Sequence, residues 1–580
     1  MRDSALISLR RMTSVYPILD PTSLCEVAGS RVFAAIMHEK LDGSMLRCVY
    51  RTAVEICFYD GCLVGPSGRF TPRELSAHWG EVGTTIEGQF SAVRANLETP
   101  RLEVRVDFLG MGQVYYWTSV GRWLLSNSVE LIARTIQSTD LDPVGMSLAL
   151  SLGSVSGDRT LHRSVRVLPA AAHWHWEGVN NDPMKICDYP ENRFWDRPRT
   201  FSFERSEAVQ LEEKLDGICA ELSKQRGVLE CPITGGRDSR ALVGLMIKGR
   251  ISTRYYTDAF PGSEEDVSIG QQIAQRLNLP YQVASKDIER LSQEWSNMVE
   301  RLVRQNDGMV SLWQIGDVLW TPRPEGSPSI RLWGIGGEIA RGHYDNPIWH
   351  YGLKTASFAK RFLSGKLLER SALITHESVA IAAKFLEQWV DQKLDEGCPI
   401  ADILDVFYTF ERVRRWAASN ARKVRPWVDV FSPFCTRPFV EAAFGLAPSL
   451  RFSEPIHYQL LRLNPELHRV PFSTEPWRSQ NSNLGMLHMI WRKKIRRAHP
   501  SRNMGISYQT LLLERNLKEV RDFCRSRHNS CVWNYVRRPQ FESLLDINTP
   551  SETRQKQLPL MLQILTLLYY EQLLNRHIMS

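Results

Sequence analysis

One stretch constrains the fold more than any other: VLECPITGGRDSRALVGLMIKGRI, residues 228–251. Its first six residues are mostly apolar, as in a strand buried on both faces, and apolar residues then recur at helical spacing. The two glycines between let the backbone turn sharply and approach a ligand, while the helix start offers unpaired N–H groups. The stretch predicts a strand, an anion-binding turn and a helix. The alternative is a tight turn without a ligand.

The turn, Thr-Gly-Gly-Arg-Asp-Ser at 234–239, is neither a P-loop nor a dinucleotide fingerprint, because it lacks Gly-Lys-Ser/Thr and the third glycine. It resembles the SGGxDS loop of the ATP pyrophosphatase family, with Thr234 in place of the first Ser. The resemblance implies ATP as a ligand and Asp238 as a ligand of Mg²⁺ that takes part in catalysis. By the same resemblance, the residues that contact ATP are Ile233, Thr234, Gly235, Gly236, Asp238 and Ser239.

The length of 580 residues exceeds what one hydrophobic core usually supports, so we expect two domains, 1–200 and 201–580. The net charge of +8 suits an enzyme that handles a nucleotide or an acidic peptide, and it is too mild to indicate nucleic-acid binding. Eleven scattered cysteines show no metal-site or disulfide spacing, which favours the cytoplasm. We expect no membrane association, because polar residues interrupt the apolar segment 558–574, which predicts a buried C-terminal helix.

Short alternating strands with turn signals fill residues 31–189 and predict an antiparallel β-rich domain. The segments 86–96, 106–117, 123–133 and 157–169 resemble the glutamine amidotransferase domain of asparagine synthetase. That family's nucleophile is a Cys directly after the initiator Met, where this chain has Arg2. Nothing around Cys25, the nearest cysteine, suggests an activated thiolate. We therefore expect a scaffold that makes no ammonia.

After a helix at 204–225, strands alternate with helices: a strand at 251–256, a helix at 266–277 and a strand at 281–284. This alternation predicts a doubly wound parallel sheet in an α/β domain with helical additions, the region 358–422 among them. Such sheets bind ligands beyond the carboxyl ends of their strands.

The segment SIRLWGIGGEIARGHYDN, residues 329–346, predicts a second strand followed by a glycine turn and Glu338. Asp238 and Glu338 would then each follow a parallel strand, and two carboxylates facing phosphate oxygens suit Mg²⁺. The alternative for Glu338 is a charge at a helix start. The segment resembles GEGADELFGGY of asparagine synthetases, which adds Gly336 to the nucleotide site. Ile335, however, replaces the family's Glu and the catalytic Tyr of β-lactam synthetase, which makes asparagine synthesis less favoured.

The region around Pro433 and Phe434 also resembles this family, and it places Asp429 where β-lactam synthetase has a catalytic Glu. Asp429 is then a candidate to orient or deprotonate the attacking amine; the alternative is an ion pair with Arg425 or Arg437. No lysine stands where relatives steady pyrophosphate, and Arg469 or Arg478 would have to replace it. The basic run 491–502 is either a peptide-binding face or solvated surface.

These parts suit the formation of an acyl-adenylate from ATP and a carboxylate, followed by amide formation. Gly-Gly-Glu followed by Ala-Arg-Gly, the inactive front domain and the coverage of about residues 80–480 resemble lasso-peptide cyclases. That resemblance implies a precursor peptide as substrate, a leader peptidase as partner and a macrolactam ring as product. The alternatives are an asparagine synthetase-like or β-lactam synthetase-like ligase acting on a small molecule, and a non-catalytic descendant.

Overall fold

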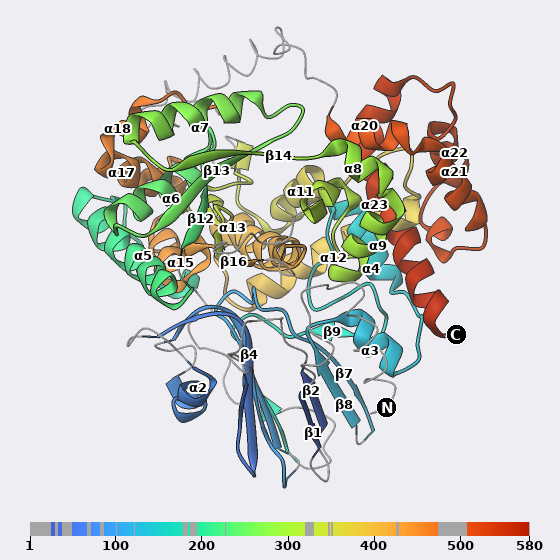
Figure 1. Cartoon of the computed structure of the whole chain (residues 1–580). Coiled ribbons are helices and arrows are strands. Elements are labelled where there is room, and N and C mark those ends of the chain that lie inside the picture. The colour runs from blue at the N-terminus through green and yellow to red at the C-terminus, as the bar shows by residue number, and fades with distance from the viewer. Residues whose placement is uncertain are drawn as a thin grey trace.

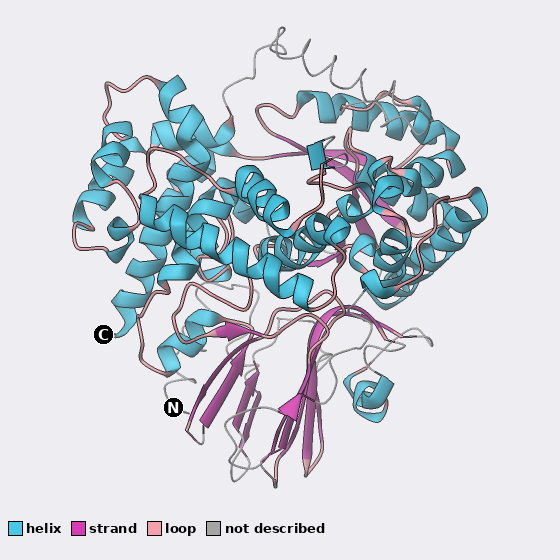
Figure 2. Ribbon diagram, turned by 180° about the vertical axis from the view of Figure 1, so that it is seen from behind, coloured by secondary structure: helices cyan, strands magenta, loops and turns pink. Residues whose placement is uncertain are grey.

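The computed structural model describes residues 25–28, 33–36, 49–65, 71–81, 86–99, 101–120, 122–177, 184–185, 194–226, 228–319, 330–345, 348–349, 352–424, 428–473 and 507–578. A β-rich N-terminal part lies below a larger body of helices around a second sheet (Figure 1). The view from behind shows the same division between the lower strands and the helical body (Figure 2). The predicted fold class, antiparallel in front and parallel α/β behind, is confirmed.

The N-terminal part contains a six-stranded antiparallel sheet in the order β11-β10-β6-β5-β4-β3. Its long strands β4 and β5 pair along their whole length, from Glu55 opposite Asn96 to Val64 opposite Glu87. The strands are β3 (Val49–Arg51), β4 (Glu55–Val64), β5 (Glu87–Asn96), β6 (Arg101–Val106), β10 (His173–Glu177) and β11 (Met184–Lys185), with helix α2 (Pro72–Ala77) and the short helix η2 (Trp79–Glu81) beside them. Strands β5, β6 and β10 each bury a run of consecutive residues, so both faces of the sheet are covered there.

Two smaller sheets accompany it. A three-stranded sheet has the order β8-β7-β9, and a separate hairpin joins β1 to β2. Their bounds are β1 (Cys25–Ala28), β2 (Phe33–Ile36), β7 (Tyr115–Ser119), β8 (Arg122–Ser126) and β9 (Arg166–Val167), with helices α3 (Val129–Thr135) and α4 (Pro143–Leu152) connecting β8 to β9. The expectation concerning Arg2 lies outside the described residues.

The body is built on a five-stranded parallel sheet in the order β14-β13-β12-β15-β16. The strands are β12 (Leu229–Pro232), β13 (Thr253–Ala259), β14 (Tyr281–Ser285), β15 (Ile330–Leu332) and β16 (Asp429–Phe431). All neighbours run parallel, so each connection crosses over through helices. The predicted strand at 251–256 begins two residues later, because Ile251 still closes the end of α6 (Arg237–Lys248) through its N–H bond to Met246.

Helices surround this sheet. In Figure 1, α5, α17 and α18 lie to the left of the strands, and α8, α9 and α20–α23 lie to the right. Their bounds are α5 (Arg205–Arg226), α7 (Glu264–Leu277), α8 (Ile288–Gln293), α9 (Trp295–Gln305), α15 (Arg437–Gly445), α16 (Pro448–Phe452), α17 (Pro455–Leu463), α18 (Pro465–Arg469), α20 (Tyr508–Arg515), α21 (Leu517–Ser526), α22 (Arg538–Leu544) and α23 (Ser551–Ile578), with short helices η4 (Phe194–Asp196), η5 (Leu312–Leu319), η6 (Gly337–Arg341), η9 (Pro433–Cys435) and η10 (Cys531–Asn534).

The predicted helical region 358–422 is present. It comprises α11 (Ala356–Leu367), α12 (His376–Asp395), η7 (Ile400–Asp402), α13 (Ile403–Phe407), a π-helix (Tyr408–Ala417, η8) and α14 (Ala418–Arg422). Ten residues in a π-helix are unusual, and such segments concentrate at functional sites.

The apolar segment at the end of the chain forms the middle of α23, as predicted, and its residues are buried in a core shared with α9 and α20. None of the described helices combines the length and the apolar character that a bilayer crossing requires. The basic run 491–502 lies outside the described residues.

Candidate active site

The order of the parallel strands fixes where a ligand can bind. Chain order runs outward from β12 to β14 on one side and from β15 to β16 on the other, so the order reverses between β12 and β15. At such a reversal the connections leave the two strands in opposite directions and open a crevice at their carboxyl ends. The turn of Thr234 follows β12, and the turn of Gly334 follows β15. The two motifs predicted from the sequence therefore emerge side by side.

The first turn is closed by its own hydroxyl groups. Thr234 Oγ1 and Ser239 Oγ lie 2.7 Å apart, and Ser239 Oγ also accepts from the Thr234 N–H at 3.2 Å. Ile233, whose side chain is fully buried, extends the sheet through its N–H bond to Tyr256. These two hydroxyls thus link the two ends of the turn at the start of α6. Ser in place of Thr234 would preserve this contact.

The N–H groups of the two glycines are engaged within the protein. Gly236 donates to Thr234 Oγ1 at 3.2 Å, and Gly235 donates to Asp266 Oδ1 of α7 at 2.8 Å. Ser473 packs on Gly235, where a Cβ atom would lie 2.3 Å from its hydroxyl oxygen. The donors suited to an anion are therefore those of the first turn of α6, which has no side-chain cap at Gly236.

The second turn is shaped around Asp238. A Cβ atom on Gly337 would lie 2.1 Å from Asp238 Oδ1, and one on Gly334 would lie 3.1 Å from the Asp238 Cβ. Gly336 adopts φ +91°, which disfavours other residues, and it faces Cys435. Asp238 approaches the backbone closely at Gly334 and Gly337, whereas Gly336 is constrained by its positive φ and by Cys435. The two motifs interlock.

The N-terminal part supports this turn from below. Gln89 of β5 exchanges two hydrogen bonds with the backbone of Ser432, at 2.7 and 3.2 Å. Ser432 Oγ in turn donates to the Ile335 carbonyl at 2.6 Å. A buried side chain of the β-rich part is thereby connected to the glycine turn through one residue.

Asp238 and Glu338 meet at a single cation. Arg341 Nη2 lies 2.5 Å from Asp238 Oδ2 and 3.4 Å from Glu338 Oε1. All three side chains are largely buried but retain some exposure, between 15 and 20%. Since one nitrogen atom touches an oxygen of each acid, the two carboxylates face the same small volume.

The environment pushes the two acids apart in pKa. Burial by itself would raise the pKa of Asp238, but the charges of Arg341, His457 and Arg237 outweigh burial and hold it below its ordinary value. Burial raises the pKa of Glu338, and the neighbouring charge of Asp238 raises it further. One site thus holds a firmly ionised acid beside an acid that resists ionisation.

A magnesium ion fits these two acids. Mg²⁺ is usually bound by one or two carboxylates together with phosphates and water. Asp238 Oδ2 and Glu338 Oε1 already share one cationic neighbour, so both acids present an oxygen to the same position. No group of three or more His, Cys, Asp or Glu side chains in the described part of the chain is arranged to hold a metal, so the remaining ligands would have to come from the nucleotide and water.

A cluster of rings borders Glu338. Tyr408, the first residue of the π-helix, contacts His343 with ring centroids 4.6 Å apart and Tyr344 at 5.5 Å. Burial and the charge of Glu338 raise the pKa of Tyr408 well above its ordinary value. Its hydroxyl is therefore a hydrogen-bond donor on the Glu338 side of the site.

Asp429 lies elsewhere on the sheet. It is the first residue of β16 and stands opposite Ile330, the first residue of β15. The glycine turn follows the other end of β15, so the strand register does not bring Asp429 to the pair of Asp238 and Glu338. One suggested partner, Arg437, lies 3.7 Å from Glu87; the other, Arg425, lies outside the described residues.

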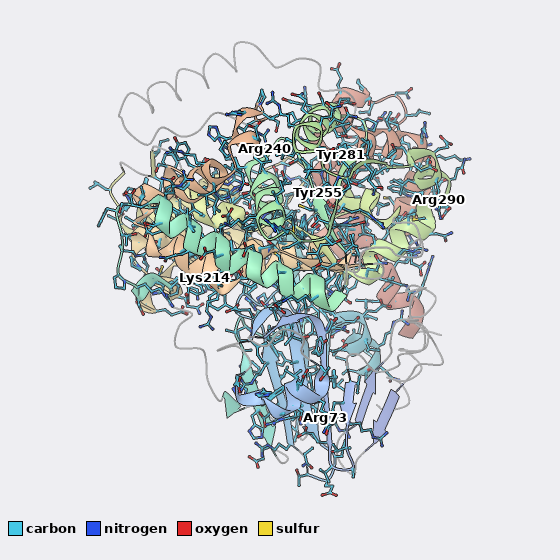
Figure 3. All side chains as sticks on the ribbon, turned by 60° about the vertical axis from the view of Figure 1, so that its left-hand side comes forward. Arg73, Lys214, Arg240, Tyr255, Tyr281 and Arg290 are labelled. Carbon is cyan, nitrogen blue, oxygen red and sulfur yellow. The ribbon has the colours of Figure 1, made fainter. Side chains whose placement is uncertain are left out.

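Arg469 is exposed at the end of α18 and pairs with Glu466. Arg478 is outside the described residues. The fully buried Arg240 does more for the site: it donates to the carbonyls of Leu467 and Val470 and lies 4.0 Å from the Phe472 ring. Arg240 thereby holds the segment that covers Gly235. Figure 3 shows it with Tyr255 in the α/β body, far from Arg73 of the β-rich part.

The sequence reasoning did not assign roles to Arg341, His457 or Asp266. Arg341 follows Glu338 by three residues, a spacing that puts both on one helical face and could have indicated the pair. Asp266 stands in an acidic first turn, which has another ready explanation in helix stability. His457 has no local signal, because its contact with Asp238 joins distant segments.

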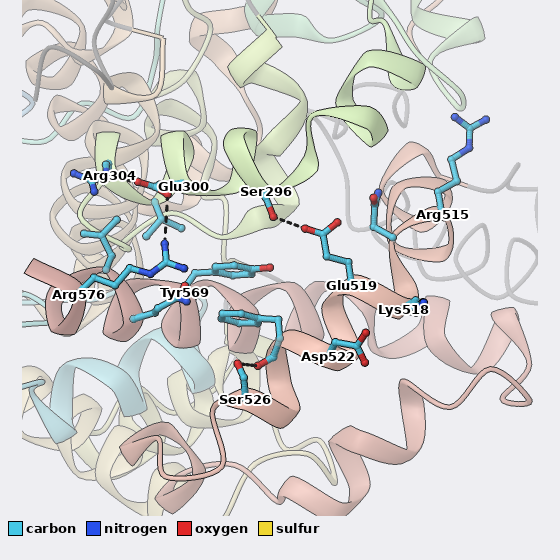
Figure 4. A pocket seen from close by; sticks show the side chains of 15 residues that line it. Ser296, Glu300, Arg304, Arg515, Lys518, Glu519, Asp522, Ser526, Tyr569 and Arg576 are labelled. Atoms are coloured by element: carbon cyan, nitrogen blue, oxygen red, sulfur yellow. Dashed lines mark hydrogen bonds and ion pairs between the residues drawn. The ribbon is translucent and has the colours of Figure 1, made fainter.

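A cavity of about 690 Å³ opens between α9, α21 and α23 (Figure 4). The stacked rings of Phe523 and Tyr569 line it, with their centroids 3.8 Å apart. Both acidic and basic side chains line the cavity, and Arg576 forms an ion pair with Glu300 at 3.8 Å. None of the residues predicted for the nucleotide site lines this cavity.

Neither a family model nor a curated protein matches the chain. Among solved structures, the chain is similar to NMN synthetase from Francisella tularensis, at 13% identity over 39% of this chain and 94% of that chain, with a TM-score of 0.18. A TM-score this low supports no statement about fold or function. The function is therefore inferred from the residues of the site itself.

Proposed function

We propose that the chain is an ATP-dependent amide ligase that adenylates a carboxylate and joins it to an amine. The observation that carries the proposal is that Asp238 and Glu338 both contact Arg341. They do so beside the start of α6, where the strand order of the parallel sheet reverses between β12 and β15. A helix start attracts phosphate, and two acids at its side attract a divalent ion. Bound triphosphate with a metal is the ligand that satisfies both.

In the first step, a carboxylate oxygen of the substrate attacks the α-phosphorus of ATP. The bond from that phosphorus to the bridging oxygen of the β-phosphate breaks, and pyrophosphate leaves with the electron pair. Asp238 and Glu338 would hold Mg²⁺, which when bound neutralises charge on the phosphates. The first turn of α6 directs its N–H groups at the same charge. Arg341, which the two acids hold protonated despite burial, adds a further cation.

In the second step, an amine nitrogen attacks the acyl carbon of the adenylate. The carbon–oxygen bond to AMP breaks, AMP leaves, and the amine gives up a proton to a base. The resemblance to lasso-peptide cyclases supports a peptide substrate, in which an Asp or Glu side chain joins the N-terminal amine freed by a leader peptidase.

The test is carboxylate-dependent exchange of labelled pyrophosphate into ATP, with Mg²⁺ and leader-free candidate peptides. We expect exchange in the wild type and a loss of at least about 100-fold in Asp238→Ala, since removal of a positioned catalytic group has effects of this order. Asp395→Ala, at the exposed end of α12, is the matched control and should retain full exchange.

Two outcomes would contradict the proposal. Exchange that survives Asp238→Ala would remove Asp238 from the site. Absence of exchange with every carboxylate, peptides and small amino acids alike, would refute adenylation itself. Exchange with small amino acids but with no peptide would keep the ligase chemistry and replace the peptide by a small-molecule substrate. Mass spectrometry of the peptide product should show the loss of one water.

A further inference from the structure

The first turn of α17 reaches the first turn of α6 at two points. Arg237 Nε lies 3.0 Å from Glu454 Oε2, and Asp238 Oδ1 lies 2.8 Å from His457 Nε2. Glu454 and His457 are three residues apart, a spacing that places both side chains on one face of a helix start. Two consecutive residues of the candidate site are therefore held by two residues of one neighbouring turn.

Glu454 and His457 each have a feature that is unfavourable for folding. Glu454 has φ +62° and ψ 38°, a left-handed conformation that is uncommon outside glycine, and only 2% of its side chain is exposed. His457 is fully buried, and among the described residues neither of its ring nitrogens makes a hydrogen bond of standard geometry; Nε2 has its close contact with Asp238 Oδ1 at 2.8 Å. Strained backbone and unsatisfied buried polar atoms persist where the surroundings enforce them, and they concentrate at functional sites.

The imidazole is also fixed in place. The rings of Phe434 and Phe439 pack around it, with centroids 6.1 and 6.2 Å from that of His457. Because this packing fixes the position of the imidazole, the imidazole sets the orientation of the Asp238 carboxylate. With Oδ1 directed at His457, Oδ2 is left to face Arg341 and Glu338.

We propose that His457 is a positioning residue that sets which carboxylate oxygen of Asp238 faces the metal–nucleotide, while Glu454 anchors the same turn through Arg237. The inference rests on the proposed function, because it assumes that Asp238 contacts a bound metal–nucleotide. His457 itself touches neither substrate nor reacting atoms. Its effect is therefore expected in the Mg²⁺ dependence of nucleotide binding.

The experiment measures binding without turnover, by calorimetry with α,β-methylene ATP, in which the bond that the reaction breaks is replaced. His457→Phe keeps a ring but removes the donor, and His457→Gln retains an amide N–H that can reach the position of Nε2. The Mg²⁺ midpoint is the Mg²⁺ concentration at which nucleotide binding is half-maximal. We expect His457→Phe to raise this midpoint at least tenfold, while nucleotide affinity at saturating Mg²⁺ stays within threefold of wild type. His457→Gln should recover the wild-type midpoint within threefold. His528→Gln, on the exposed surface, is the control.

The outcomes separate the two proposals. A wild type that binds nucleotide with Mg²⁺, together with an unchanged midpoint in His457→Phe, would overturn the role of His457 alone. An equal loss in both His457 variants, with parallel drops in melting temperature, would make His457 merely structural and would also overturn it. A wild type that binds no nucleotide at all would overturn the proposed function, and the role of His457 with it.

Discussion

The substitution Gly337→Ala tests the interlocked glycine turn most directly. The added Cβ atom would lie 2.1 Å from Asp238 Oδ1 and 2.7 Å from the carboxylate carbon, whereas ordinary contacts begin at 3.4 Å. Gly337 does not have a positive φ, so alanine fits its backbone and the conflict is confined to the Asp238 side chain. The Asp238 carboxylate must therefore move by more than about 1 Å, and a displacement of that size costs roughly 100-fold in rate.

The assay is pyrophosphate exchange, combined with unfolding in urea. We expect Gly337→Ala to lose about 100-fold in exchange, while its free energy of unfolding changes by less than about 2 kcal/mol. Gly365→Ala is the matched control, because nothing lies within 4 Å of a Cβ atom at that position in α11. It should leave exchange unchanged and stabilise the helix by roughly 0.5–1 kcal/mol. Gly337→Ala with exchange within threefold of wild type would refute the close approach of Asp238 as a requirement.

Two further predictions concern residues outside that contact. Glu103 accepts from Trp79 at 2.7 Å and pairs with Arg94 at 3.0 Å; burial opposes ionisation, but His173, Arg94 and Trp79 hold its pKa below the ordinary value. The free energy of unfolding at pH 7 should therefore be about 3–5 kcal/mol larger for the wild type than for Glu103→Gln, and this difference should shrink as the pH falls below about 4. Urea titrations at several pH values measure it. A difference that grows toward acid would contradict the ion pairing. For Asp429→Asn, the family resemblance predicts slower amide formation with intact adenylation. The position of Asp429 at the start of β16 instead predicts less than about a twofold change in either step. Single-turnover measurements of adenylation and of amide formation decide between the two.

Much of the architecture follows from local pattern. The apolar run before Thr234 and the helical spacing after Ser239 predicted β12 and α6, and the same reasoning located β15, the glycine turn and the long C-terminal helix. These succeed because apolar periodicity and glycine turns are properties of adjacent residues. The ends of β13 differ from the predicted ones by two and three residues; it begins later because the end of α6 takes up residues that look like strand.

The role of Asp429 stays a prediction, because it depends on a local motif match. Pro433 and Phe434 do reach the glycine turn region, since Ser432 bonds to the Ile335 carbonyl and Cys435 packs on Gly336. Asp429 lies three residues earlier, at the opposite end of a short strand. A few residues along a strand shift a side chain by roughly 3.3 Å each, so a motif match fixes a neighbourhood but not which side chain faces a site.

By itself, the sequence determined that this chain carries two strand–glycine turn–acid units, because each is encoded in consecutive residues. Only the tertiary structure decided that the acids of the two units share Arg341, that Gly337 makes room for Asp238, and that His457 of α17 holds its other oxygen. The reason is physical: hydrophobic periodicity specifies which faces are buried, but the order of strands in the sheet specifies which turns become neighbours. The contact of Arg341 with Asp238, 103 positions apart, arises from that order.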